Sequence, residues 1–205
     1  MLLAAGASTR FGSPKMLAPV GEKGTPLLQL VSETWLEAGI DDLLIVLGCG
    51  AADIRATIEE NLLRRVNTEK RLAAGSSVRF VENSRWESGM FTSVKAGLAA
   101  ASRASTHFAI SPADLPFLSK SSLRTVLDAA RSVEASQTTV VVPTHARHRG
   151  HPLVIPAALR DRILSWPDSA RLNRLFAESD VRVLHLDGFD ESILHDVDRV
   201  EDLVS

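Results

Sequence analysis

The sequence predicts an α/β protein built around a mainly parallel sheet, and three observations lead to this fold class. Apolar runs of strand length alternate with longer segments that carry the apolar stripe of a helix. Runs such as LLIVLG (43–48) are apolar throughout, as expected of a strand covered by helices on both faces. Clusters of glycine, proline and polar residues follow most of these runs, where parallel sheets bind their ligands. With 205 residues, the chain is expected to form a single domain over 1–205.

The expected elements alternate along the chain. Strands are predicted at 2–5, 43–48, 78–83, 107–111 and 138–143, and helices at 26–39, 51–65, 90–102 and 119–133. The first helical segment, PLLQLVSETWLEAG, begins with proline and ends with glycine, which is the asymmetry typical of helix ends. The segment from Glu69 to Ser77 is predicted to be a mobile connection.

Composition and charge exclude several classes of protein. Lys plus Arg number 23 against 25 for Asp plus Glu, which gives a net charge of -2, and no long basic run is present. Nucleic acid is therefore not an expected partner. No apolar stretch reaches the roughly 18 residues of a membrane span and no secretory leader pattern is seen, so we expect a cytoplasmic protein that does not engage a membrane. Cys49 is the only cysteine, which excludes an intramolecular disulfide and a cysteine-based zinc site.

The loop after the first strand, in LLAAGASTRFGSPK, combines glycines with two cations, Arg10 and Lys15. The spacing of Gly6 and Gly12 fits neither the G-x-x-x-x-G-K-[ST] of a Walker A loop nor the G-x-G-x-x-G of a dinucleotide fingerprint. Both motifs use the same physics, because glycines let backbone N–H groups approach an anion while Arg and Lys add charge. The loop is therefore either a site for an anion such as a phosphate chain or an ordinary surface turn with two solvated cations.

Acidic residues follow a strand and occur again in the tail. Asp114, in SPADLP, comes after the strand at 107–111, and the tail segment HDVDRVEDL supplies Asp196 and Asp198. Mg²⁺ takes one or two protein carboxylates and completes its shell with water and substrate phosphates. The two tail aspartates would share a face if the stretch were extended. Alternatively, Asp114 caps a turn and Asp198 caps the last helix.

With these motifs in view, the sequence resembles a known family. LAAGASTRFGSPK is similar to the L-A-A-G-x-S-x-R-x-G-x-x-K signature of the MobA-like nucleotidyltransferases and, within them, of the molybdenum cofactor cytidylyltransferases. The resemblance covers nearly the whole chain, because later segments agree in order: SGMFTSVKAGL, PADLPFL, RGHPLVIP and DVDRVEDL. It implies a Rossmann-like three-layer nucleotidyltransferase domain with a mainly parallel sheet. The implied reaction moves CMP from CTP to the phosphate of molybdenum cofactor and releases pyrophosphate.

The resemblance also implies roles for individual residues. Arg10, Lys15 and Asp114 are the expected catalytic residues, with both cations on the triphosphate. Mg²⁺ is the expected cofactor, held by Asp114 and by Asp198, whose place in the D-x-x-x-D-L pattern favours it over Asp196. The residues expected to bind the nucleotide are Leu3, Ala4, Ala5, Gly6, Ala7, Ser8, Arg10, Lys15, Ser88, Gly89 and Ser93. The residues expected near the acceptor are Gly150, His151 and Pro152.

The sequence departs from the family pattern at two places. The first strand is expected to be shorter than is usual in the family, and Arg199 and Val200 stand where the tail element usually has threonine and proline. The L-A-A-G start of the loop, rather than the L-A-G-G of guanylyl-transferring relatives, favours CTP over GTP. The evenly spaced His145, His148 and His151 have no carboxylate within their run, so a polar loop is expected there rather than a zinc centre.

The expected partners are CTP and a molybdopterin-type acceptor, with a molybdoenzyme or its chaperone as the recipient of the product. Two alternatives remain open. One is a nucleotidyltransferase of the same fold that uses GTP or a sugar phosphate. The other is a nucleotide-binding module without turnover.

Overall fold

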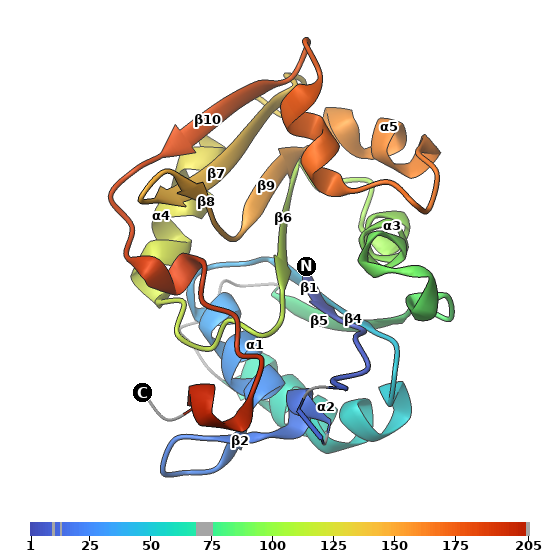
Figure 1. The fold of residues 1–205 in the computed structure, drawn as a ribbon, viewed down its shortest axis with the longest axis vertical. Coiled ribbons are helices and arrows are strands. Elements are labelled where there is room, and N and C mark those ends of the chain that lie inside the picture. The colour runs from blue at the N-terminus through green and yellow to red at the C-terminus, as the bar shows by residue number, and fades with distance from the viewer. Residues whose placement is uncertain (10, 13, 69–75, 204–205) are drawn as a thin grey trace.

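The computed structural model describes residues 1–9, 11–12, 14–68 and 76–203. The predicted connection at 69–77 lies outside the described residues except at its last two positions, and the second of these, Ser77, already belongs to a strand. Figure 1 shows a layered arrangement in which helices pack on both sides of a twisted sheet. The predicted α/β fold is confirmed.

The helices and strands follow one another in the order expected. The strands are β1 Leu2–Ala4, β2 Pro19–Val20, β3 Thr25–Pro26, β4 Asp42–Leu47, β5 Ser77–Glu82, β6 His107–Pro112, β7 Thr139–His145, β8 His148–Arg149, β9 Leu153–Pro156 and β10 Arg182–Leu186. The α-helices are α1 Leu27–Glu37, α2 Ala51–Thr68, α3 Met90–Ala100, α4 Lys120–Arg131 and α5 Arg160–Ser165. Short 3-10 turns are η1 Lys15–Leu17, η2 Trp86–Ser88, η3 Ala157–Leu159, η4 Leu172–Ala177, η5 Glu191–Ile193 and η6 Val200–Leu203.

The main sheet has eight strands in the order β10-β7-β9-β6-β1-β4-β5, with β8 paired to β7. β1 lies between β4 and β6 and is parallel to both, with Leu3 opposite Val46 and Pro112. β9 is antiparallel to β6 and β7, and β8 is antiparallel to β7. The central strand β1 therefore delivers the loop that follows it to the middle of the carboxyl edge of the sheet, which is the ligand-binding edge of such folds.

Alternation along β4 shows how the two faces are covered. Leu43, Ile45 and Leu47 pack into a core with α1, α2 and α4, whereas Leu44 and Val46 pack into a second core with α3 and α5. Successive side chains of a strand point to opposite faces, so a run that is apolar throughout is buried on both. This is why LLIVLG could be assigned to a strand from its composition alone.

Several elements were not predicted from the sequence. They are the strands β2, β3, β8, β9 and β10 and the helix α5. β9 spans four residues and is bounded by Pro152 and Pro156, which mask its strand character. β10 contains exposed and partly buried residues but no fully buried position, as expected at the edge of a sheet.

A cavity of about 740 Å³ lies at the amino ends of β4 and β6, away from the carboxyl edge. The Met1 ammonium lines it and donates a hydrogen bond of 2.7 Å to the Ala109 carbonyl oxygen. Burial lowers the pKa of this amine from 8.0 to about 5, although the Asp42 carboxylate acts in the opposite direction. The titratable neighbours in the cavity are Asp41, the ion pair of Asp42 with Arg79, His107 and Arg131.

We expect the free energy of unfolding of the 205-residue chain to rise between about pH 5 and pH 8. In this range the Met1 amine is still protonated in the unfolded chain but has released its proton in the folded chain. The unfolded state therefore binds more protons, and the folded state becomes more stable relative to it as pH increases. The change is at most about 4 kcal/mol. His107, whose pKa burial also lowers, adds in the same direction. Urea unfolding at several pH values measures the slope, and Nα-acetylation is the control because it should remove most of it. A slope unchanged by acetylation would rule out the amine as its source.

Among the described residues, no helix is both long enough and apolar enough to span a membrane.

Candidate active site at the carboxyl edge

The loop after β1 is shaped by backbone conformations that most residues avoid. Ser8 and Gly12 have φ values of 53° and 76°, and the Phe11 N–H donates to the Ser8 carbonyl oxygen at 2.9 Å. The Phe11 ring is buried in the core that includes residues of α1, α2 and α4, and it anchors the loop to that core. Arg10 lies outside the described residues, so its predicted role stays a prediction. The loop reaches Lys15 at the start of η1.

Lys15 is a buried cation that joins three separate segments. Its Nζ donates to Asp114 Oδ2 at 2.6 Å and to the Val197 carbonyl oxygen at 2.6 Å. The Val197 N–H in turn donates to the Asp114 carbonyl oxygen at 2.9 Å. The Lys15 and Asp114 side chains are only 11% and 19% exposed, respectively, so the pair is shielded from solvent. The first loop, the end of β6 and the tail are thus held together at one point, which Figure 1 shows as the red tail running beside the dark blue loop.

A cavity of about 190 Å³ opens beside this point. Its lining brings together residues from the first loop, Asp114 and Asp198: Gly6, Ser8, Thr9, Phe11, Lys15, Met16, Asp114 and Asp198. Asp196 is exposed and does not line it. The sequence interpretation that set Asp114 and Asp198 near the cationic loop therefore agrees with their positions.

One carboxylate oxygen of Asp114 has no hydrogen-bond partner among the described residues. Oδ2 accepts from Lys15, whereas Oδ1 is buried and has no hydrogen-bond partner among the described residues. A buried oxygen without a partner costs free energy, and a cation or a donor group of a ligand would remove that cost. Asp114 Oδ1 and Asp198 are oxygen ligands of the kind that Mg²⁺ and Mn²⁺ prefer. The residues present therefore fit a divalent cation bound between protein and phosphates.

The tail turn that carries Asp198 is held by a second aspartate. Asp202 accepts hydrogen bonds from the N–H groups of Arg199 at 2.8 Å and Asp198 at 2.9 Å. These bonds lower the pKa of the Asp202 carboxyl, so it stays ionised. The residue belongs to the D-x-x-x-D-L pattern, but sequence reasoning gave it no role. Its role is to fix the backbone of Asp198.

A second cavity of about 370 Å³ lies on the other side of the first loop, between Gly6 to Gly12 and the segment after β4 that contains Cys49 and Gly50. The two segments touch at Gly48. A Cβ atom added there would lie 2.6 Å from Trp86 Cβ and 2.7 Å from the Ala5 carbonyl oxygen. The Cys49 N–H donates to that same carbonyl oxygen at 3.2 Å. Gly48 therefore allows the start of the first loop and the loop after β5 to pack against each other.

We expect Gly48→Ala to destabilise the protein by about 1 to 3 kcal/mol, because the new methyl group would have to displace backbone. For a chain of this size the melting temperature should fall by roughly 3 to 10 °C. Gly6→Ala is the control, since among the described residues no atom beyond its chain neighbours lies within 4 Å of the position of a Cβ at Gly6. Differential scanning calorimetry of both variants checks the prediction, and equal melting temperatures would contradict the close packing described for Gly48.

The predicted acceptor residues lie where β8 leads into β9. The Gly150 N–H donates to the Pro143 carbonyl oxygen at 2.8 Å, and the His151 N–H donates to the Ile193 carbonyl oxygen at 2.9 Å. Burial lowers the pKa of His151, although Asp114 and Asp196 act in the opposite direction, so the imidazole is neutral at pH 7. Pro152 follows in a cis peptide bond.

The three evenly spaced histidines do not gather around a common point. His145 and His148 pair across β7 and β8, and the His145 Nδ1 atom lies 2.7 Å from the Phe189 carbonyl oxygen. Within the described part of the chain, no group of three or more His, Cys, Asp or Glu side chains is arranged to hold a metal ion.

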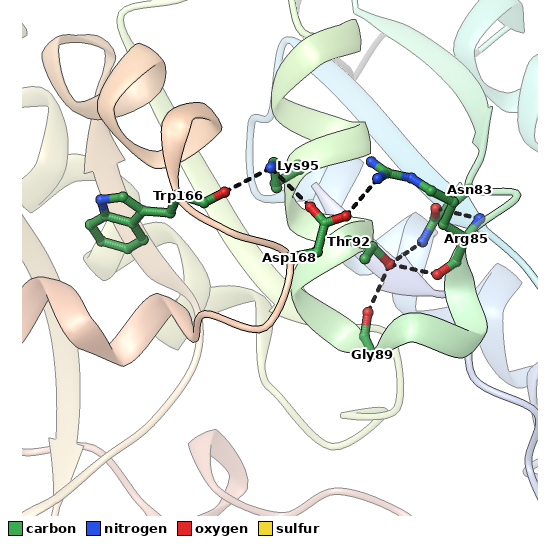
Figure 2. Close-up of polar contacts among 7 residues, drawn as sticks. All are labelled: Asn83, Arg85, Gly89, Thr92, Lys95, Trp166 and Asp168. Atoms are coloured by element: carbon green, nitrogen blue, oxygen red, sulfur yellow. Dashed lines mark hydrogen bonds and ion pairs between the residues drawn. The ribbon is translucent and has the colours of Figure 1, made fainter.

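The predicted nucleotide residues Ser88 and Gly89 are exposed at the turn that precedes α3, and Gly89 has φ of 111°. Ser93 is different, because it is only 3% exposed and accepts a hydrogen bond from Asn83 at 3.0 Å. Asn83 also donates to the Thr92 hydroxyl at 2.8 Å, as Figure 2 shows. Sequence reasoning gave Asn83 no role, although it is a polar residue directly after a predicted strand.

A charged cluster fastens α3 to the segment after α5 (Figure 2). Asp168 accepts from Lys95 at 2.9 Å and from Arg85 at 2.5 Å, and Lys95 also donates to the Trp166 carbonyl oxygen at 2.8 Å. The bond to Lys95, followed by the charges of Arg85 and Lys95, lowers the pKa of Asp168. No sequence pattern joins residues so far apart, so this cluster was not predicted. Its effect is to hold the middle of α3 against a neighbouring loop.

Comparison with known proteins agrees with this geometry. Residues 1–183 match the family described as the MobA-like NTP transferase domain. The chain is 35% identical over 208 residues to nicotine blue oxidoreductase of Paenarthrobacter nicotinovorans, covering 99% of this chain and 93% of that protein. Among solved structures, Rv0371c of Mycobacterium tuberculosis has a TM-score of 0.71 at 26% identity and covers 98% of this chain and 93% of that chain. A structure of Rv0371c with manganese has a TM-score of 0.63 at 23% identity, covering 92% and 87%. The chain therefore belongs to the MobA-like NTP transferase domain family.

Proposed function

We propose that the protein transfers CMP from CTP to the terminal phosphate of molybdenum cofactor and releases pyrophosphate. The observation that carries this proposal is the convergence of Lys15, Asp114 and Asp198 on one cavity beside the loop after β1. A cation for phosphates, two carboxylates for a divalent metal and a loop that exposes backbone N–H groups are what nucleotidyl transfer requires. The proposal treats residues 1–205 as one domain.

In the proposed reaction a phosphate oxygen of the acceptor attacks the α-phosphorus of CTP in line. A new P–O bond forms while the bond between the α-phosphorus and the bridging oxygen breaks, and pyrophosphate leaves with that oxygen. Reactions of this type need positioning and charge neutralisation rather than a covalent intermediate. Lys15, with Arg10, would bind the β- and γ-phosphates, and the N–H groups of Ala5 to Ser8 would hold the chain of phosphates.

A divalent cation, Mg²⁺ in this proposal, would neutralise charge on the phosphates when bound. Asp114, through its unpartnered Oδ1, and Asp198 would hold it. The manganese in the structure of Rv0371c supports a divalent metal in this fold. Lys15 keeps the Asp114 carboxylate oriented, and Asp202 keeps the turn of Asp198 in place.

The choice of CTP rests on the L-A-A-G start of the first loop. Ala5 packs against Gly48, so this part of the loop is closely confined. On the acceptor side, Gly150, His151 and Pro152 would contact the pterin, and a molybdoenzyme or its chaperone would receive the product. GTP and a sugar phosphate are the alternative substrates for the same site.

A redox function is the second candidate, because the curated relative at 35% identity is called an oxidoreductase. The residues of this chain favour nucleotidyl transfer over a redox function. The first loop lacks the G-x-G-x-x-G spacing typical of dinucleotide cofactors, whereas its lysine and the two aspartates are suited to a metal-bound triphosphate.

The test is a pyrophosphate-release assay with Mg²⁺, with CTP or GTP, and with molybdenum cofactor, a sugar phosphate or no acceptor. Release only with CTP and molybdenum cofactor supports the proposal. Release with GTP or with the sugar phosphate corrects the substrate. If no combination releases pyrophosphate while nicotine blue is reduced by NADH or NADPH, the redox function replaces nucleotidyl transfer as the proposed function.

A further inference from the structure

The orientation of the Asn83 side chain is fixed by a backbone group. Asn83 follows β5, is 4% exposed, and its Oδ1 accepts a hydrogen bond of 3.0 Å from the Arg85 N–H. A backbone N–H can only donate, so the amide oxygen must face it and the Nδ2 hydrogens must face the other way. Both hydrogens point at hydroxyl groups of α3, one at Thr92 and one at Ser93 (Figure 2 shows the former).

This orientation decides what the two hydroxyl groups can do. Each oxygen accepts a hydrogen bond from Asn83, so each hydroxyl proton is left to be donated elsewhere. Thr92 Oγ1 has the carbonyl oxygens of Gly89 at 2.8 Å and Arg85 at 3.0 Å as acceptors. Ser93 Oγ has no acceptor for its proton among the described residues, although the residue is 97% shielded from solvent. A buried donor without a partner is costly, which points to an acceptor that a ligand supplies.

The position of Ser93 on α3 indicates which part of the site it faces. One turn further along the helix, Gly97 packs against Met1, which directly precedes β1, and against Val46 of β4. Residues four apart share one face of a helix, so Ser93 is on the same face but one turn closer to the start of α3. Because α3 follows β5 and returns along a parallel sheet, its start lies at the carboxyl edge, where Ala5 and Gly48 meet. Ser93 thus belongs to the wall beside the start of the first loop.

We propose that Asn83 is a positioning residue that makes the Ser93 hydroxyl a hydrogen-bond donor to the nucleoside part of the bound triphosphate. This inference rests on the proposed nucleotidyl transfer and specifies how the site would recognise its nucleotide. The phosphates are recognised by the first loop and Lys15, whereas the nucleoside presents carbonyl, ring nitrogen and hydroxyl acceptors that a fixed donor can distinguish. Asn83 does not touch the ligand itself.

The decisive variant is Asn83→Asp. A carboxylate at this position can still accept from the Arg85 N–H, but it can no longer donate, so Thr92 and Ser93 must turn their protons toward it. Ser93 then presents only acceptor lone pairs to the ligand. We expect the dissociation constant for CTP to rise about tenfold in Asn83→Asp and in Ser93→Ala, the effect of losing one hydrogen bond at a shielded site. Because both changes remove the same donated proton, the double variant should bind CTP no more weakly than either single variant.

Two controls separate recognition from damage to the fold. Ser32→Ala removes another buried hydroxyl, which donates to the Leu28 carbonyl oxygen within α1, and should leave CTP affinity unchanged. Inorganic tripolyphosphate carries the phosphates without the nucleoside, so its affinity should be the same for wild type, Asn83→Asp and Ser93→Ala. In turnover assays KM for CTP should rise while kcat stays within about twofold.

Isothermal titration of CTP and of tripolyphosphate distinguishes failure of the inference from failure of the proposed function. If wild-type protein binds neither compound, nucleotidyl transfer itself is wrong. If wild-type protein binds CTP and both single variants bind it equally well, only the role of Asn83 and Ser93 is wrong. The inference is also overturned if the variants lose CTP and tripolyphosphate affinity alike, because that result means a distorted loop.

Discussion

Replacing Asp114 by asparagine is expected to reduce nucleotidyl transfer by about 1000-fold while nucleotide binding persists. Asp114 supplies the one carboxylate oxygen at the cavity that is buried and without a partner among the described residues. An amide has nearly the same shape and can still accept from Lys15, but it carries no charge for a divalent cation. Pyrophosphate release at saturating CTP and Mg²⁺ measures the rate, and titration of CTP measures the binding.

The tail offers matched variants for the same experiment. Asp198→Asn should cost about 100-fold in rate, because Asp198 lines the cavity together with Asp114. Asp196→Asn should stay within about twofold, because Asp196 is exposed and does not line the cavity. A full loss in Asp196→Asn with an active Asp198→Asn would reverse the assignment of the second metal ligand. Full activity of Asp114→Asn would refute the metal site.

Much of the fold could be predicted because it depends on local patterns. Runs such as 43–48 and 107–111 are apolar on both faces, so their strand length and their place between helices can be recognised without knowing the neighbours. The antiparallel β9 could not be predicted, because the three residues between Pro152 and Pro156 are too few to show a periodicity, and its pairing with β6 and β7 is set by tertiary structure. The same holds for the edge strand β10, whose only sheet partner is β7 among the described residues.

The candidate site divides in the same way. Lys15, Asp114 and the tail aspartates are charged residues at strand ends or in a motif, so residue type and position were enough to single them out. The structure adds residues that support the site and that the spacing of motifs in the sequence does not reveal. Asn83 and Asp202 act through hydrogen bonds to neighbouring backbone and hydroxyl groups, and Asp168 bridges two cations more than 70 residues away in sequence. Such supporting residues carry no sequence signature of their own, because the partners of their hydrogen bonds are set by tertiary structure.

Replacing Lys15 by methionine is expected to reduce kcat/KM by about 100- to 1000-fold and to lower stability as well. Lys15 Nζ binds both Asp114 Oδ2 and the Val197 carbonyl oxygen, so methionine leaves a shielded carboxylate and a carbonyl without their donor. Removing one partner of a shielded ion pair costs about 3 to 5 kcal/mol, mostly because the remaining charge is uncompensated. Unlike Asp114→Asn, this variant should also weaken binding of tripolyphosphate, because the proposed role of Lys15 is to bind the phosphates.

The double variant Lys15→Met with Asp114→Asn shows whether the stability loss comes from the unpaired charge. Because the second change removes that charge, the double variant should melt at a higher temperature than Lys15→Met alone, although it would be as inactive as either. Lys23→Met, at an exposed position of the β2–β3 hairpin, is the matched control and should change neither stability nor activity. If the double variant were less stable than Lys15→Met, the lysine would be holding the tail mainly through Val197 rather than balancing Asp114. Lys15 would then serve to hold the tail beside the cavity rather than to compensate the charge of Asp114.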